Sequence, residues 1–300
     1  MMILALTLAF QTLETAPAIE ADQAADPIAA LLETREPASL SQAQPQTGCV
    51  GEFTESHFIA CQYGPGSRIN LGGIEATGDV AGWAVLALPR QTETPQPFRV
   101  ELADGTVIVD EVREIGQRDY ALQRVNGVPG ATVNPDPSTL PRRQREYAQK
   151  QEAFNSVWDG VGYLDGFVEP SQGVMTGVFG SARIYNDGAE RGVHWGIDWA
   201  NQTGTPVVAP AGGLVTLAEA DMYYEGGLIF IDHGQGVVSA FLHLSAVHVE
   251  TGQIVEQGEL IGDIGAGGRS TGPHLDWRVK LRNQFYADPQ TLLDLDIPTE

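Results

Sequence analysis

Two short stretches of the sequence hold side chains that could bind one metal ion. His274 and Asp276 lie two residues apart, where a strand is expected to follow Pro273, so they point to the same face of it. His194 and Asp198 lie four residues apart and also share one face of an extended segment. Imidazole nitrogens and carboxylate oxygens are common ligands of zinc. The two stretches are therefore predicted to form the two halves of a metal site.

A hydrolytic metal site needs more than its ligands. A catalytic zinc ion takes three protein ligands and keeps one position open for water. His194, Asp198 and one member of the His274/Asp276 pair supply three ligands. Hydrolysis of an amide also needs a base and a group that steadies the oxyanion. The other member of the pair and His243, at the end of a predicted strand, are the candidates for these roles.

The elements that must position these residues predict a mainly β fold. In residues 171–295, short β-type runs alternate with turns that contain glycine, such as Gly226-Gly227 and Gly267-Gly268. Many short strands at this spacing are typical of an all-β sandwich or barrel. Strands are expected at residues 173–179, 206–209, 213–218, 227–232, 237–243, 259–264 and 274–279.

Three further segments precede this domain. Residues 47–128 contain short β-type runs and an Asp104-Gly105 turn, which predicts a small β-sandwich as an accessory domain. Residues 138–160 predict a linker helix, with Ser138 as its cap and a proline in its first turn. Residues 19–46 are rich in Ala, Gln, Pro and acidic residues, which predicts a disordered tether.

The net charge of the chain indicates which partners it can bind, and its N-terminal segment indicates its cellular compartment. The chain has 300 residues and a formal net charge of -22, so it repels phosphate backbones and is not expected to bind nucleic acid. Residues 1–18 contain a short apolar run and a small-x-small site at Ala16-Pro17-Ala18, which predicts a signal peptide. No Lys or Arg precedes the run, so an uncleaved apolar N-terminus is the alternative. We expect export to the periplasm or cell envelope, with no stable membrane span after cleavage.

The two cysteines, Cys49 and Cys61, lie twelve residues apart. They flank a strand-like stretch with a polar centre, and two facing hairpin strands would bring them within bridging distance. An even pair in an exported chain predicts a disulfide. A pair of buried thiols is the alternative.

A series of short motifs runs through the C-terminal region. They are Val178-Phe179-Gly180, His194-Trp195-Gly196-Ile197-Asp198, Thr205-Pro206-Val207-Val208-Ala209-Pro210, Ile231-Asp232-His233-Gly234-Gln235-Gly236, Phe241-Leu242-His243-Leu244-Ser245, Val255-Glu256-Gln257-Gly258 and Ser270-Thr271-Gly272-Pro273-His274. No single motif is specific, but the ordered set resembles the lysostaphin-type (LytM-type) zinc metalloendopeptidases, which cleave peptidoglycan peptides. The resemblance covers residues 171–293 and implies an all-β peptidase domain. The β segment before it looks like the accessory domain of exported relatives.

The resemblance also implies a role for each site residue. Zinc would be held by His194, Asp198 and the residue at the second position of a His-x-His motif, which here is Asp276. The first position of that motif, His274, and the strand-end His243 would be catalytic. Arg183, Tyr185 and Tyr223 lie in loops that flank the site, and we expect them to contact the peptide or the oxyanion.

Asp276 departs from the family pattern. One His and two carboxylates bring a divalent ion to about zero net charge, whereas two His and one carboxylate leave it near plus one. A less positive ion acidifies its water less, and a set of ligands richer in oxygen favours harder ions such as manganese or iron. We therefore expect zinc or another divalent transition metal, with weaker or differently tuned activity.

Several neighbouring residues are expected to be structural. Trp195, Trp199 and Trp277 suit core packing, although one of them could instead line a substrate groove. His233 matches a turn position that is not a ligand in the family, and His248 has no match and is expected at the surface.

Three functions are compared on these grounds. The first is a metal-dependent endopeptidase that acts on peptidoglycan stem peptides, with cell-division or wall-remodelling proteins as partners. The second is a catalytically degenerate relative that binds the wall or activates another hydrolase; it is less favoured because four of five site residues match the family. The third is a carrier domain, because residues 258–265 resemble biotinyl and lipoyl modules. It is excluded because neither Lys150 nor Lys280 lies at a hairpin tip.

Overall fold

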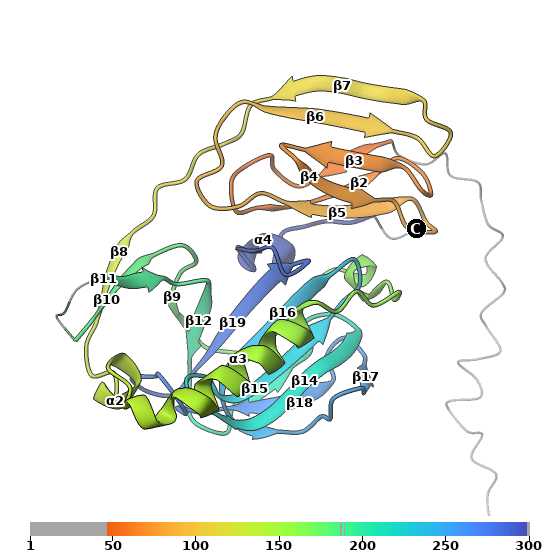
Figure 1. Cartoon of the computed structure of the whole chain (residues 1–300). Helices are drawn as coiled ribbons and strands as arrows, with labels where there is room; N and C mark the ends of the chain where they lie inside the picture. Colours follow the sequence, from red (N-terminus) through yellow and green to blue (C-terminus); the bar gives the residue numbers. More distant parts are fainter. Residues whose placement is uncertain (1–46, 187, 189, 299–300) are drawn as a thin grey trace, which may run out of the picture. The chain divides into compact units, whose positions relative to one another are not determined.

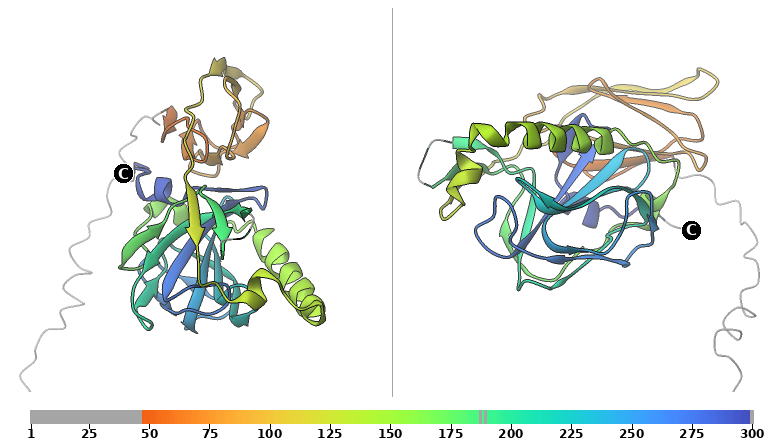
Figure 2. Two further views of the ribbon diagram at one scale, coloured as in Figure 1. Left: turned by 90° about the vertical axis from the view of Figure 1, so that its left-hand side faces the viewer. Right: turned by 60° about the horizontal axis from the view of Figure 1, so that its bottom comes forward.

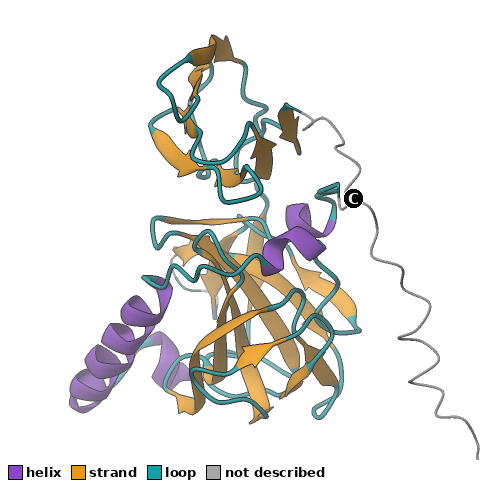
Figure 3. Ribbon diagram, turned by 90° about the vertical axis from the view of Figure 1, so that its right-hand side faces the viewer, coloured by secondary structure: helices purple, strands orange, loops and turns teal. Residues whose placement is uncertain are grey.

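The computed structural model describes residues 47–186, 188 and 190–298. The predicted signal peptide (1–18) and tether (19–46) lie outside these residues. The described chain is mainly β, as predicted, and its strands form four sheets with a few helices outside them (Figure 3). No helix in this part of the chain is long and apolar enough to cross a membrane.

Two small antiparallel sheets form the N-terminal region. Their strands are β1 (Gly48–Val50), β2 (Phe58–Gln62), β3 (Arg68–Leu71), β4 (Ile74–Thr77), β5 (Trp83–Ala87), β6 (Gln96–Glu101) and β7 (Val107–Arg113), in the orders β1-β2-β5 and β4-β3-β6-β7 (Figure 1). Ile59 and Leu86 of the first sheet share a buried cluster with Phe98 of the second, so the two sheets pack as a sandwich.

The sheet β1-β2-β5 is buried on both faces. Alternate side chains of a strand point to opposite faces, and in β2 Ile59 packs into the sandwich while Phe58 joins the core of the C-terminal region. Burial on both faces explains why β2 and β5 are continuous apolar runs instead of alternating ones. Cys49 and Cys61 are opposite each other on β1 and β2 and form a disulfide, which confirms that prediction.

The C-terminal region is built on one ten-stranded sheet whose paired strands are all antiparallel. Its strands are β9 (Val174–Gly177), β12 (Gly196–Ala200), β13 (Pro206–Val208), β14 (Gly213–Met222), β15 (Gly226–Asp232), β16 (Val237–Val247), β17 (Ile254–Val255), β18 (Leu260–Ile264), β19 (His274–Leu281) and β20 (Phe285–Ala287). The main path is β17-β14-β15-β16-β19-β12-β9, and β18 pairs with β13 and β16. Each strand predicted from the sequence overlaps an observed one. Three strands of this sheet are absent from the predicted list. β12 lies in the segment that was predicted only as extended, and β17 and β20 have two and three residues, too few to show a pattern.

A third small sheet joins distant parts of the chain. It contains β8 (Leu122–Val125), β10 (Ala182–Tyr185) and β11 (Glu190–Val193), and β8 lies parallel to β10 (Figure 2). β8 falls within the range predicted for the accessory domain, 47–128, but it pairs with the C-terminal region instead.

The helices cover the sheet or connect its parts. They are α2 (Gly130–Val133), α3 (Leu140–Phe154) and α4 (Gln290–Leu293). Phe154 of α3 packs with Phe230 on the outer face of the large sheet. The predicted helix 138–160 is wrong at both ends: Ser138 lies in a 3-10 turn capped by Asp136, and the helix ends at Phe154.

Candidate metal centre

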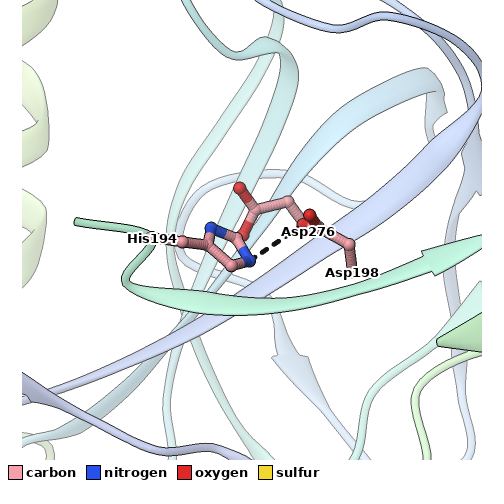
Figure 4. Close-up of side chains that lie close together, drawn as sticks. All are labelled: His194, Asp198 and Asp276. Atoms are coloured by element: carbon pink, nitrogen blue, oxygen red, sulfur yellow. Dashed lines mark ion pairs between the residues drawn. The ribbon is translucent and has the colours of Figure 1, made fainter. Parts of the chain in front are cut away.

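The three predicted ligands meet between two neighbouring strands. Asp198 on β12 and Asp276 on β19 are direct cross-strand partners, and His194 lies just before β12 (Figure 4). Their ligand atoms all lie within 4.8 Å of one another. The three residues are only 2%, 5% and 1% exposed for His194, Asp198 and Asp276, so their charges are largely withdrawn from water. Two carboxylates directly opposite each other repel unless positive charge lies beside them.

The unpaired atoms of this cluster fit a divalent cation. His194 Nδ1 and Nε2 and Asp198 Oδ1 are buried and have no hydrogen-bond partner in the described part of the chain. His194 Nε2 lies 3.2 Å from Asp198 Oδ1, the contact drawn in Figure 4. Buried polar atoms normally have partners, so unpaired atoms that face one another suit a shared ion. The nitrogen and oxygen donors are of the types that bind zinc and other divalent transition metals.

Two arginines pair with the two carboxylates. Arg183 Nη2 donates to Asp198 Oδ2 at 2.5 Å, and Arg278 Nη2 donates to Asp276 Oδ2 at 2.6 Å. Burial acts to raise the pKa of Asp276, but Arg278 outweighs it and holds that pKa well below its usual range. Both carboxylates are therefore ionised and able to bind a cation. A carboxylate oxygen has two lone pairs, so these ion pairs leave acceptor capacity for a metal.

The Arg183 side chain is itself fixed by β8 and β9. Its Nε donates to Gln123 Oε1 on β8 at 3.1 Å. A Cβ atom on Gly177 of β9 would lie 2.1 Å from Asp198 Oδ2 and 2.7 Å from Arg183 Nη2, so only glycine leaves room for this ion pair. The parallel pairing of β8 with β10 thus brings a residue of the connecting segment to the metal cluster.

Sequence reasoning missed Arg278 and Gln123. Arg278 lies two residues after Asp276 on β19, so strand alternation was a usable signal for a cation on the ligand face. No comparable signal existed for Gln123, because its position depends on pairing between β8 and a strand about sixty residues later.

The two predicted catalytic histidines lie side by side next to the ligands. The ring centroids of His243 and His274 are 4.7 Å apart, and His274 Nε2 lies 3.9 Å from Asp198 Oδ1. His274 Nδ1 lies 2.8 Å from Gly272 O, and His243 Nδ1 lies 2.8 Å from Gly267 O. A carbonyl oxygen only accepts hydrogen bonds, so each neutral ring carries its proton on Nδ1 and has a lone pair on Nε2.

Burial, together with the neighbouring His274, lowers the pKa of His243 to about 4. His243 is therefore neutral near pH 7 and available as a proton acceptor. Its backbone has a φ of +67°, which is uncommon for a residue other than glycine. The position explains this conformation: β16 pairs with β19 up to Leu242 and with β18 from Leu244, so the strand changes partner at His243.

A cavity of about 280 Å³ adjoins these residues. Asp198, His274, Arg183 and Tyr185 line it, so two of the three predicted substrate contacts lie at the cavity. Tyr223 does not line it, and its hydroxyl donates instead to Ala131 O at 2.9 Å. The sequence could not show which way the Tyr223 ring points.

The remaining aromatic and histidine residues are held in structural contacts. Trp199 and Trp277 are buried and stack at 6.0 Å, and the partly buried Trp195 packs on the same core. His233 is fully buried, with Nδ1 donating to a backbone carbonyl and Nε2 facing Ser239 Oγ. His248 is exposed and pairs with a surface aspartate.

Comparison with known proteins places this site in a family. Residues 192–289 match the model of peptidase family M23. The DD-carboxypeptidase/endopeptidase Mpg of Neisseria meningitidis is 39% identical over 107 residues, which are 36% of this chain and 24% of that protein. The peptidoglycan DD-endopeptidase ShyC of Vibrio cholerae is 32% identical over 114 residues, which are 38% of this chain and 26% of that protein. The chain thus spans about a quarter of the length of these curated relatives.

The likeness to a solved structure extends further. A Pseudomonas aeruginosa structure described as a peptidase M23 matches 81% of this chain and 96% of its own, with a TM-score of 0.62 and 29% identity. The fold match therefore includes residues outside the region that the family model covers. The chain carries a peptidase family M23 domain of the lysostaphin type, as its motifs predicted.

Proposed function

We propose that this protein is a metal-dependent endopeptidase that hydrolyses the peptide cross-links of cell-wall peptidoglycan. The observation that carries the proposal is the meeting of three buried ligands with two histidines, each of which turns Nδ1 to a backbone carbonyl and leaves Nε2 free of that contact. The name of the relative ShyC, a peptidoglycan DD-endopeptidase, supports the substrate class.

The proposed metal is zinc, held by His194, Asp198 and Asp276. Bound there, such an ion would supply Lewis acidity. His274 and His243 each present an Nε2 lone pair and so act first as proton acceptors. Once protonated, either ring can donate to the oxyanion or to the leaving amine.

Arg183 and Tyr185, which flank the site, are proposed to have different roles. Arg183 is committed to Asp198 and to Gln123, so its proposed task is to orient a metal ligand instead of binding the peptide. Tyr185 lines the cavity and remains the proposed peptide contact.

The proposed compartment is the periplasm or the cell envelope, where peptidoglycan lies. The Cys49–Cys61 disulfide supports export, because disulfides persist mainly in oxidising compartments.

One observation favours a second function, a wall-binding protein without activity. Arg183 and Arg278 balance the charges of Asp198 and Asp276, so the cluster is neutral in charge even when no ion is bound. The two ion pairs could therefore continue to stabilise the fold in a protein that had lost its catalytic activity.

Incubation with purified sacculi separates the two functions. The released muropeptides are measured with zinc or manganese added, for the wild type and for His274→Ala. His248→Ala is the matched control, because His248 is exposed, pairs with Asp263 and is not one of the ligands. Cleaved cross-links that disappear only in His274→Ala support the endopeptidase. Binding to sacculi without release in either metal supports the second function.

A further inference from the structure

Within the described residues, the cavity beside the proposed catalytic histidines contains a cation that has no acidic partner. Arg269 lines this cavity together with Asp198 and His274. In the described part of the chain, no carboxylate forms an ion pair with Arg269, whereas Arg183 and Arg278 each have one. The chain has 39 acidic residues and only 17 basic ones, so acidic partners are plentiful. An unpaired guanidinium at this place is therefore available to an anionic ligand.

Two tyrosine rings hold the Arg269 guanidinium. Its Cζ atom lies 5.3 Å from the ring centroid of Tyr185 and 5.3 Å from that of Tyr224. Tyr224 is fixed in turn, because Arg143 Nη1 donates to its hydroxyl at 3.2 Å and the Tyr223 ring packs edge-on against it. Aromatic contacts of this kind engage the guanidinium without using its N–H groups. The side chain is thus pre-positioned, and none of its N–H groups donates a hydrogen bond to the part of the chain that the structure describes.

The backbone at Arg269 is also held by specific contacts. Its N–H donates to Tyr224 O at 2.8 Å. The preceding Gly268 has a φ of +72°, and a Cβ atom there would lie 2.3 Å from the same carbonyl oxygen. This close approach ties the loop that carries Arg269 to the turn between β14 and β15.

The same loop holds the catalytic His274. Ser270 Oγ lies 3.2 Å from His274 Nδ1 and donates to Gly272 O, which also contacts that ring nitrogen. A ligand bound at Arg269 is therefore held by the same short segment as His274. The cavity, at about 280 Å³, is near the lower limit of typical ligand pockets, so it admits only a small part of a peptide.

We propose that Arg269 binds a free carboxylate of the peptide substrate close to the scissile bond. The inference rests on the proposed peptidase function and adds a determinant of specificity to it. A guanidinium fork matches a carboxylate with two parallel hydrogen bonds. Arg183 is not suited to this task because Asp198 already occupies it. The carboxylate can belong to a C-terminus or to a side chain, and the chemistry that recognises it is the same.

The test compares cross-linked muropeptides whose C-terminal carboxylate, side-chain carboxylate, or neither has been converted to an amide. We expect kcat/KM of the wild type to fall about 10- to 100-fold for one of the two amides, as loss of a charge-assisted hydrogen bond implies. Arg269→Gln should lose about the same factor on the free peptide and nothing more on that amide. Arg269→Lys should recover part of the loss. Arg145→Gln, which changes an exposed arginine of α3, is the matched control.

Binding of the same peptides, measured by calorimetry, tests Arg269 separately from catalysis. If no peptide is cleaved, the proposed function fails, but tighter binding of the free peptide by wild type than by Arg269→Gln still supports the carboxylate contact. Equal affinity of the wild type for the free peptide and both amides overturns the inference, even if all three are cleaved. Thermal unfolding shows that each variant is folded.

Discussion

Asp276 and Arg278, two residues apart on β19, form a bidentate ion pair: Arg278 Nη2 lies 2.6 Å from Asp276 Oδ2, and Nε lies 3.0 Å from Oδ1 and 3.2 Å from Oδ2. The expectation of a weakly activating site counted the charge of Asp276 alone. With Arg278 included, the pair is neutral, as is the histidine that the resemblance places at this position. The charge argument for weaker activity therefore loses its basis, although the oxygen donor still favours a harder ion.

This ion pair predicts that Asp276→His alone does not improve the metal site. The substitution leaves the Arg278 guanidinium beside the ligands without a partner, and breaking such a pair costs about 3–5 kcal/mol. We expect a lower melting temperature and at least a 10-fold weaker zinc affinity by calorimetry. The double variant Asp276→His/Arg278→Gln should recover both. Equal affinities of the single and double variants would show that Arg278 does not compensate Asp276.

Gly177→Ala tests the ion pair on the other carboxylate. The new methyl group would overlap Asp198 Oδ2, so Asp198 must move away from Arg183 and from His194. We expect zinc affinity to fall at least 10-fold while the protein stays folded. Gly48→Ala is the matched control, because no atom lies within 4 Å of the Cβ position there. Unchanged affinity in Gly177→Ala would mean that the Asp198–Arg183 geometry does not set metal binding.

Removal of metal should lower thermal stability. A ligand that binds the folded state alone stabilises it in proportion to the logarithm of its concentration, by about 2.7 kcal/mol at 100 times Kd. Addition of zinc to chelator-treated protein should therefore raise the melting temperature of the wild type and of His248→Ala, but not of His194→Ala. A rise of the same size in His194→Ala would place the ion elsewhere.

His233 predicts a loss of stability in mild acid. Burial lowers its pKa to about 4, whereas the unfolded chain titrates near 6.5. The folded state keeps the ring neutral and the unfolded state binds a proton below pH 6.5. The contribution of His233 to the free energy of unfolding is therefore fully present above pH 6.5. It falls by roughly 3 kcal/mol as the pH drops towards 4.

The free energy of unfolding in urea, measured across this pH range, checks the prediction. His243, whose pKa is also lowered to about 4, adds a second contribution of the same sign. The slope of the free energy of unfolding against pH measures the number of protons taken up on unfolding. His233→Asn should reduce that number by about one, even though the variant is less stable at every pH. A slope identical to that of the wild type would show that His233 does not titrate on unfolding.

Local patterns in the sequence determined the parts of this protein that depend on near neighbours. The alternation of a strand placed His274 and Asp276 on one face, and the hairpin spacing brought Cys49 to Cys61. The same alternation extends to Arg278, so the partner of Asp276 was also within reach of the sequence. Ordered motifs completed the set by bringing in His194 and Asp198.

Tertiary structure alone decided which further residues surround the two ligand segments of the metal site. Gln123 reaches Arg183 only because β8 pairs in parallel with β10, and this pairing is set by packing between segments far apart in the chain. His243 takes its left-handed backbone because β16 changes partner there. Arg269 lines the cavity and contacts the rings of Tyr185 and Tyr224, whereas the Tyr223 hydroxyl donates to Ala131 O. Spacing in the sequence determines which side chains share one face of a β-strand. Pairing and packing between distant strands determine which other residues that face contacts.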